Sequence, residues 1–469
     1  MKTNTKAADK RLDLSARLAG GQGALAAAQD AEALLRRSVL ANLLWENIAY
    51  ENGESLTENI QKLVPQVAPE AVARIAIEAR IKQKLRHVPL FLAREMARHP
   101  THRHLVGTLL PQIIHRADEI SEFVALYWKD GKKPLAKQVK IGLASAFANF
   151  DAYQLAKYNR QNEVKLRDVL FLVHPRPPQG KEALYKQIAD NTLPTPDTWE
   201  VALSTGASKK ETWERLISER KLGALAFLRN LRNMESAGVS PTVIHNGFAN
   251  VNAKWLLPLN FLSAAKATPQ WVREIESLML RGLSSGPKLP GHTVLVADVS
   301  GSMSWKISEK SDFTRLDACL AMMILGAEMC ESVSIYATAG DDHTRVHATQ
   351  RVVPHRGFAL SGEITKCGRE LGGGGIFTRQ CLEYIRAQER EKPARVIVFS
   401  DSQDCDYPDK RVPTPFGERN YIVDVSANTR GINYKGVWTA EISGWSEHFL
   451  AFIAALEGQS LSASTQDDE

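Results

Sequence analysis

The hydrophobic pattern changes from helical to strand spacing near residue 290, and this change constrains the fold more than any other feature. Apolar residues recur at helical spacing up to residue 281, with little β-branched alternation. The segment 282–291 is rich in glycine, serine and proline, which break regular structure. Residues 292–297 then form a short apolar run that is typical of a buried strand. We therefore expect a helical part followed by an α/β part.

The helical part is predicted to consist of many short helices. Pro69 and Glu70 mark the start of one, because proline and acidic residues favour the first helical turn. Its apolar residues then lie on one stripe, and similar stripes occur elsewhere. The stripe residues are Val72, Ile75, Ala76 and Ala79, and the other segments are 33–49, 103–114, 118–128, 134–149, 209–220, 222–235 and 270–281. Such a series suggests a degenerate helical-repeat solenoid, with a large compact all-α domain as the alternative.

Charge also divides the chain of 469 residues. The net charge of +6 combines +13 in residues 1–290 with −7 in residues 291–469. The positive part is the candidate surface for a polyanion, although basic helices can simply have solvated faces. The five cysteines lack metal-type spacing and fit reduced thiols in a cytosol. No apolar run is long enough to span a membrane and the first residues are polar, so we expect a cytoplasmic protein without a signal peptide.

Basic and aromatic residues are interleaved between positions 132 and 174. Single-stranded RNA needs this mixture, because cations contact phosphates and flat rings stack on bases. Phe147 and Phe150 are expected to belong to the core. A solvated helix face away from any ligand is the alternative for the cations. The candidate RNA-binding residues are Lys133, Lys137, Lys140, Lys157, Arg160, Arg167 and His174.

A second candidate site follows the strand at 292–297. Asp298 ends this strand, and the next residues complete a D-x-S-x-S motif with Ser300 and Ser302. Asp401 follows a second predicted strand, 394–400, and Thr378 begins a helix after four glycines. Carboxylate and hydroxyl oxygens at strand ends suit Mg²⁺ or Mn²⁺, whereas a chance serine-rich turn is the alternative. No general base is evident, so the site does not look hydrolytic.

These five residues resemble the metal-ion-dependent adhesion site (MIDAS) of von Willebrand factor A domains. The resemblance implies a doubly wound α/β sheet with helices on both faces. It also implies that the open metal position accepts an acidic residue of a partner protein. Many such domains have threonine directly after the glycines, whereas here Ile376 and Phe377 intervene. This departure makes Thr378 a weaker assignment than Asp298, Ser300 and Ser302.

The chain as a whole resembles the Ro autoantigen family, whose helical module is called TROVE. The similarity runs from about residue 33 to 456 and depends on the order of several modest motifs. These are Leu35-Arg-Arg, Tyr50-Glu-Asn-Gly, Glu78-Ala-Arg, Leu85-Arg-His-Val-Pro-Leu, Leu155-Ala-Lys-Tyr, Arg167-Asp-Val-Leu, His174-Pro-Arg-Pro and Ala226-Phe-Leu-Arg-Asn-Leu-Arg-Asn-Met.

The resemblance implies a bacterial or phage-type Ro-like protein with a ring of HEAT-like helical repeats. The expected divisions are an N-terminal extension (1–32), a TROVE module (33–283), a linker (284–291), an A domain (292–456) and a flexible tail (457–469). Members of the family hold single-stranded ends of defective noncoding RNA in the ring. They bind small structured Y RNA on its basic outer surface, and bacterial members are associated with an exoribonuclease.

We therefore expect a monomeric, non-enzymatic RNA-binding protein of noncoding-RNA quality control. The first alternative is a protein-interaction module that binds an acidic partner through Mg²⁺ or Mn²⁺ in the A domain. The second is a metal-dependent nuclease, which is disfavoured because only one hard-metal site is visible.

Overall fold

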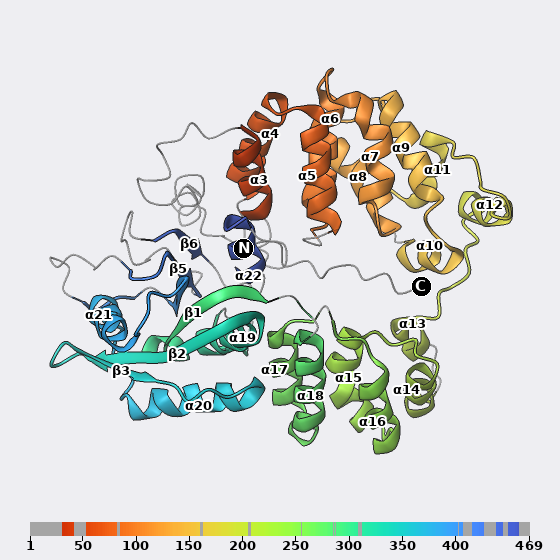
Figure 1. Ribbon diagram of the computed structural model, residues 1–469. Helices are drawn as coiled ribbons and strands as arrows, with labels where there is room; N and C mark the ends of the chain where they lie inside the picture. The colour runs from red at the N-terminus through yellow and green to blue at the C-terminus, as the bar shows by residue number, and fades with distance from the viewer. Residues whose placement is uncertain are drawn as a thin grey trace. The chain divides into compact units, whose positions relative to one another are not determined.

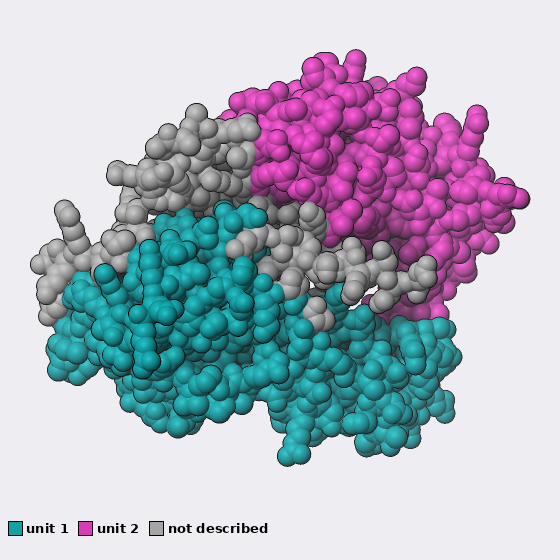
Figure 2. All heavy atoms as spheres, in the orientation of Figure 1, with its two compact units in different colours: residues 1–28, 50–52, 208–469 teal, residues 29–49, 53–207 magenta. Residues whose placement is uncertain are grey.

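The computed structural model divides into two compact units, which Figure 2 shows in separate colours. Unit 2 comprises residues 29–49 and 53–207, and unit 1 contains residues 208–469. The structure describes residues 31–41, 53–81, 85–159, 163–204, 208–254, 256–284, 286, 288–307, 312–401, 403–406, 415–425, 438–443 and 449–458. Parts of the predicted extension, first helix and tail, at 1–30, 42–49 and 459–469, lie outside these residues.

Unit 2 is helical throughout its described part (Figure 1). Its elements are α3 (Ala31–Ala41), α4 (Gly53–Leu63), η3 (Val64–Gln66), α5 (Pro69–Ile81), α6 (His87–Arg98), η4 (Arg103–Leu105), α7 (Val106–Ile113), α8 (Asp118–Tyr127), α9 (Lys137–Phe147), α10 (Ala152–Tyr158), α11 (Leu166–Val173), α12 (Glu182–Asp190) and α13 (Trp199–Ser204). The four predicted stripe residues of α5 are all buried, so the helical period was correct.

The helices of unit 2 stack in two layers. The first contains α5, α7, α9 and α11, each packed on the next, and the second contains α6 and α8. Stacking of alternate helices buries one apolar face of each helix, which is the packing of a helical-repeat solenoid. The predicted repeat architecture is therefore confirmed, and the compact all-α alternative does not describe this unit.

Unit 1 combines further helices with a six-stranded sheet. Its helical elements are α14 (Lys209–Ser218), α15 (Ala224–Ser236), α16 (Pro241–Asn250), α17 (Pro258–Ala267), η5 (Pro269–Trp271), α18 (Val272–Leu283), η6 (Gly301–Ser304), α19 (Arg315–Met329), α20 (Gly357–Glu370), α21 (Thr378–Gln388) and α22 (Phe449–Leu456). Its strands are β1 (Leu289–Asp298), β2 (Cys330–Asp341), β3 (Val346–Arg351), β4 (Arg395–Ser400), β5 (Arg419–Asp424) and β6 (Ala440–Ser443).

The sheet has the strand order β3-β2-β1-β4-β5-β6 and is parallel except for the edge strand β3. Side chains alternate between the two faces along each strand, and helices cover both faces. On one face Val294 and Val296 pack with α21 in a core cluster. On the other, Leu295 meets Gly326 of α19, and Phe399 packs edge-on against Phe449 of α22. The predicted doubly wound α/β fold is confirmed.

Two layers of helices run through unit 1 and into the sheet part. One contains α14, α16, α18 and α20, and the other contains α15, α17 and α19. Lys266 on α17 forms an ion pair of 2.5 Å with Asp317 on α19, and Glu276 on α18 accepts a hydrogen bond of 2.6 Å from the backbone N–H of Phe358 on α20. The segment 284–291, expected as a linker, thus lies inside one compact unit.

The cysteines are all free, and four of them are buried. Within the described ranges, no helix combines the length and apolar character that crossing a bilayer requires.

Candidate nucleic-acid interface and cation site

The candidate RNA-binding cations lie on α9, α10 and α11 and at their ends. Lys133 precedes α9, Lys137 and Lys140 are on α9, Lys157 is on α10, and Arg167 is on α11. His174 follows α11 as its C-cap with a left-handed backbone (φ 48°). All six side chains are exposed, whereas Arg160 lies outside the described residues.

The local fold explains why these cations face outward. The apolar residues Val139, Leu143 and Phe147 bury one face of α9, so Lys137 and Lys140 share the opposite side. Helix α10 begins at a capping box formed by Asp151 and Gln154, which fixes its start directly after α9. Phe147 and Phe150 are buried, as predicted, and are not available for stacking.

Exposed aromatic rings accompany two of the candidate cations. Tyr153 is 45% exposed and Phe171 is 50% exposed. The Lys157 ammonium lies 5.6 Å from the ring centres of both Tyr153 and Tyr158, and the Arg167 guanidinium lies 5.4 Å from that of Phe171. Such pairs offer a phosphate contact beside a ring on which a base can stack.

Two residues of this surface, Arg116 and Phe171, were not predicted from the sequence. The Arg116 guanidinium lies 4.6 Å from the centre of the Tyr158 ring, and the Lys157 ammonium lies near the same ring. Arg167 and Phe171 are four residues apart on one helix, a spacing that could have revealed their contact. No local pattern joins Arg116 to Tyr158, because 42 positions separate them.

Arg116 is held in place by a buried network of charged residues. Glu119 on α8 is fully buried and accepts hydrogen bonds from the Arg80 guanidinium at 2.7 Å and from the backbone N–H groups of His115 and Arg116. The Arg116 guanidinium donates to Asp118, which is also buried. These charge-assisted bonds fix the loop before α8 and the base of the interface.

The oxygen-rich site lies at the carboxyl ends of β1 and β4. Asp298 ends β1 and is completely buried. Its carboxylate accepts a hydrogen bond of 2.8 Å from the Ser300 backbone N–H and one of 2.6 Å from the Ser400 hydroxyl. The Ser300 and Ser302 hydroxyl oxygens lie 3.3 Å apart. Burial raises the pKa of Asp298 to about 6, and the nearby Asp401 charge adds to the effect.

Thr378 lies on the helix, and Asp401 directly after the strand, that the sequence predicted. Thr378 is the first residue of α21, and its buried hydroxyl has no hydrogen bond of normal geometry among the described residues. Asp401 directly follows β4 and forms a buried ion pair with Arg315 at the start of α19. The contacts of Ser400 with Asp298 and of Arg315 with Asp401 were not predicted from the sequence.

The donor set fits a hard cation. It offers buried carboxylates, clustered hydroxyls and one unsatisfied hydroxyl oxygen, which are ligand types that Mg²⁺ and Mn²⁺ prefer. Among the described residues, no cluster of three or more His, Cys, Asp or Glu side chains has an arrangement that could hold a metal ion. Arg315 already balances the Asp401 carboxylate, and the Asp404 carboxylate accepts a hydrogen bond of 3.1 Å from the Thr378 backbone N–H.

Comparison with known proteins agrees with the fold. The TROVE domain model matches residues 28–191 and 190–324, well over half of the chain. The telomerase protein component 1 of Rattus norvegicus is 24% identical over 274 residues, which cover 40% of this chain and 10% of that protein. The chain thus spans about a tenth of the length of this curated relative.

A solved structure shows the same architecture. The crystal structure of the Deinococcus radiodurans RO (RSR) protein superposes with a TM-score of 0.64 at 16% identity, covering 90% of this chain and all of that one. At this identity the likeness concerns the fold of helical repeats plus an A-like domain. Because the family model matches more than half of its residues, the chain belongs to the TROVE domain family, a family of RNA-binding proteins.

Proposed function

We propose that this protein binds noncoding RNA and acts in RNA quality control or processing. The carrying observation is the set of exposed cation–aromatic pairs on α10 and α11, formed by Lys157 with Tyr153 and by Arg167 with Phe171. Phosphates of a single strand would meet the cations while unstacked bases meet the rings. The lysines of α9 extend this surface with charge alone.

The finer parts of the proposal follow the family resemblance. The helical repeats would close into a ring that holds single-stranded RNA ends, and the basic surface would bind small structured, Y-like RNA. An exoribonuclease would then be recruited through the bound RNA, since the protein itself is proposed to be a non-enzymatic, monomeric component of a cytoplasmic ribonucleoprotein.

The test is the salt dependence of RNA binding by a four-site variant. Each phosphate contact on a single strand contributes about 0.7 to the slope of log affinity against log salt. If all four cations contact phosphates, their replacement should lower the slope by about three. The variant is Lys137→Gln, Lys140→Gln, Lys157→Gln and Arg167→Gln, measured by fluorescence anisotropy with a labelled ten-nucleotide oligouridine.

A matched control removes four exposed cations elsewhere in the same unit. Its substitutions are Lys62→Gln, Arg74→Gln, Arg103→Gln and Lys186→Gln. The control has the same net charge as the test variant, so it should lose some affinity through the weaker long-range field and keep its slope. Equal slopes in the two variants would move the RNA site away from α9–α11.

We also propose that the oxygen-rich site binds Mg²⁺ or Mn²⁺. The buried Thr378 hydroxyl, which has no hydrogen-bond partner among the described residues, supports this proposal together with the buried Asp298 and Ser300. When bound, the ion would supply a Lewis acid that can accept a carboxylate of an acidic partner. Calorimetric titration with Mn²⁺ should show binding to the wild type that Asp298→Ala removes, with unchanged far-ultraviolet circular dichroism. Unchanged affinity in the variant would refute the assignment.

A further inference from the structure

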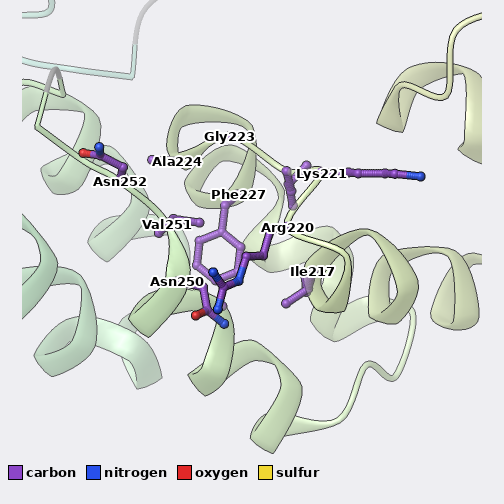
Figure 3. A pocket seen from close by; sticks show the side chains of 11 residues that line it. Ile217, Arg220, Lys221, Gly223, Ala224, Phe227, Asn250, Val251 and Asn252 are labelled. Atoms are coloured by element: carbon purple, nitrogen blue, oxygen red, sulfur yellow. The ribbon is translucent and has the colours of Figure 1, made fainter. Parts of the chain in front are cut away.

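Unit 1 contains a pocket that none of the cations on α9–α11 lines. Helices α14, α15 and α16, the loop between α14 and α15 and the residues after α16 line this pocket of about 290 Å³ (Figure 3). This volume is at the small end of ligand pockets and offers room for one compact group. The walls include Leu222 and Val251, and Phe227 forms the apolar floor.

The floor depends on a glycine. Phe227 is fully buried and packs edge-on against Phe248, with ring centres 4.9 Å apart. A Cβ atom at Gly247 would lie 2.4 Å from the Phe227 ring, so only glycine lets α16 approach this closely. The pocket is therefore a built feature of the packed helices.

The polar groups of the pocket are basic or neutral. Among the described residues that line it, none is acidic, and both Arg220 and Asn250 are exposed at its rim. Neither side chain makes an ion pair or hydrogen bond within the described part of the chain. In Figure 3 both end below the Phe227 ring, while the Lys221 side chain extends away and pairs with Glu219 at 2.8 Å.

The backbone of Arg220 indicates that stability alone does not account for this residue. Helix α14 ends with hydrogen bonds from the Arg220 and Lys221 N–H groups to the carbonyls of Ile217 and Leu216, and Arg220 has a φ of 55°. This left-handed position after a helix is the one that glycine favours most. An arginine there is less stable than glycine and directs a guanidinium to the pocket rim.

We propose that this pocket holds one nucleotide of a single-stranded RNA, with its phosphate on the Arg220 guanidinium and its polar edge on the Asn250 amide. A guanidinium binds phosphate oxygens through paired N–H donors, and an amide can both donate to and accept from a base or ribose. This inference rests on the proposed RNA-binding function and adds a second contact in the other unit.

The test uses the full chain and the variants Arg220→Gly and Asn250→Asp. Arg220→Gly removes the cation and places glycine at the left-handed position, so its melting temperature should equal or exceed that of the wild type. Its affinity for a labelled ten-nucleotide oligouridine should fall about tenfold, the effect of losing one charged hydrogen-bonding group. Asn250→Asp should weaken binding at least as much, and the control Lys221→Gln should bind RNA nearly as well as the wild type.

The outcomes separate this inference from the proposed function. Normal RNA affinity in Arg220→Gly and Asn250→Asp overturns the pocket assignment, whatever the α9–α11 variant does. Weak binding in these variants together with a normal slope in the α9–α11 variant supports the pocket and refutes the surface on unit 2. Uridine monophosphate that binds as tightly as the oligouridine would also overturn the inference, because the ligand would then be a free nucleotide. The inference would also be overturned in favour of an acidic protein partner if Arg220→Gly weakened the binding of a hexaglutamate peptide but not the binding of RNA.

Discussion

Replacing Glu119 with Gln tests the buried charge network next to the proposed RNA-binding surface. The Glu119 carboxylate is fully buried and receives hydrogen bonds from Arg80, Arg86 and two backbone N–H groups. Glutamine has nearly the same volume but presents one acceptor and one donor, so the Arg80 guanidinium, only 6% exposed, would lose its counter-charge. Breaking a buried ion pair on one side costs about 3–5 kcal/mol, a large share of the stability of a domain.

The assay must report on unit 2, because the two units need not unfold together. Hydrogen exchange measured by mass spectrometry on peptides from α5 and α8 gives the opening free energy at the network itself. Glu122→Gln is the matched control, since Glu122 is 31% exposed and pairs with the partly exposed Arg86. We expect a loss of less than about 1 kcal/mol for this control. A loss in Glu119→Gln no larger than in the control would refute the reasoning.

Three further outcomes are expected. Gly247→Ala should destabilise unit 1 by about 1–3 kcal/mol in thermal unfolding, because the new methyl group collides with the Phe227 ring. Arg315→Gln should lower the melting temperature in EDTA and regain stability in Mn²⁺, with tighter Mn²⁺ binding by calorimetry, since Asp401 loses its internal cation. Purified protein should leave end-labelled RNA intact in Mg²⁺; cleavage that disappears in Asp298→Ala would contradict a non-enzymatic role.

The elements that follow from local pattern were predictable from the sequence. The stripe of α5 specifies one buried face, and the apolar run of β1 specifies a strand that is buried on both faces. Thr378 was correctly predicted to start a helix. The place of the oxygen-rich motif was equally predictable, because Asp298, Ser300 and Ser302 lie within five residues of sequence and carboxyl ends of parallel strands meet at one edge of a sheet.

Contacts between distant segments were not predictable. Arg315 reaches Asp401 across 86 positions, and Arg80 reaches Glu119 across 39. Arginines and acids are common on any helix, so nothing local marks these as buried pairs. The pocket was missed for a related reason: Arg220 replaces the glycine that normally signals a helix end, and Gly247 looks like a weak point in α16 until Phe227 is seen against it.

Near residue 290 the hydrophobic period changes from helix to strand, but the packing of the helical layers continues across this point. Strand spacing begins in β1, yet α19 and α20 continue the two helical layers that start at α14 and α15. The TROVE domain match also runs through β1 to residue 324, inside α19. On α18 the buried residues Ile275, Leu278 and Met279 belong to a helix that packs against both α19 and α20. A cut in 284–291 would separate these helices and expose apolar surface, so the A-like domain serves as the end of the repeat stack as well as the carrier of the oxygen-rich site.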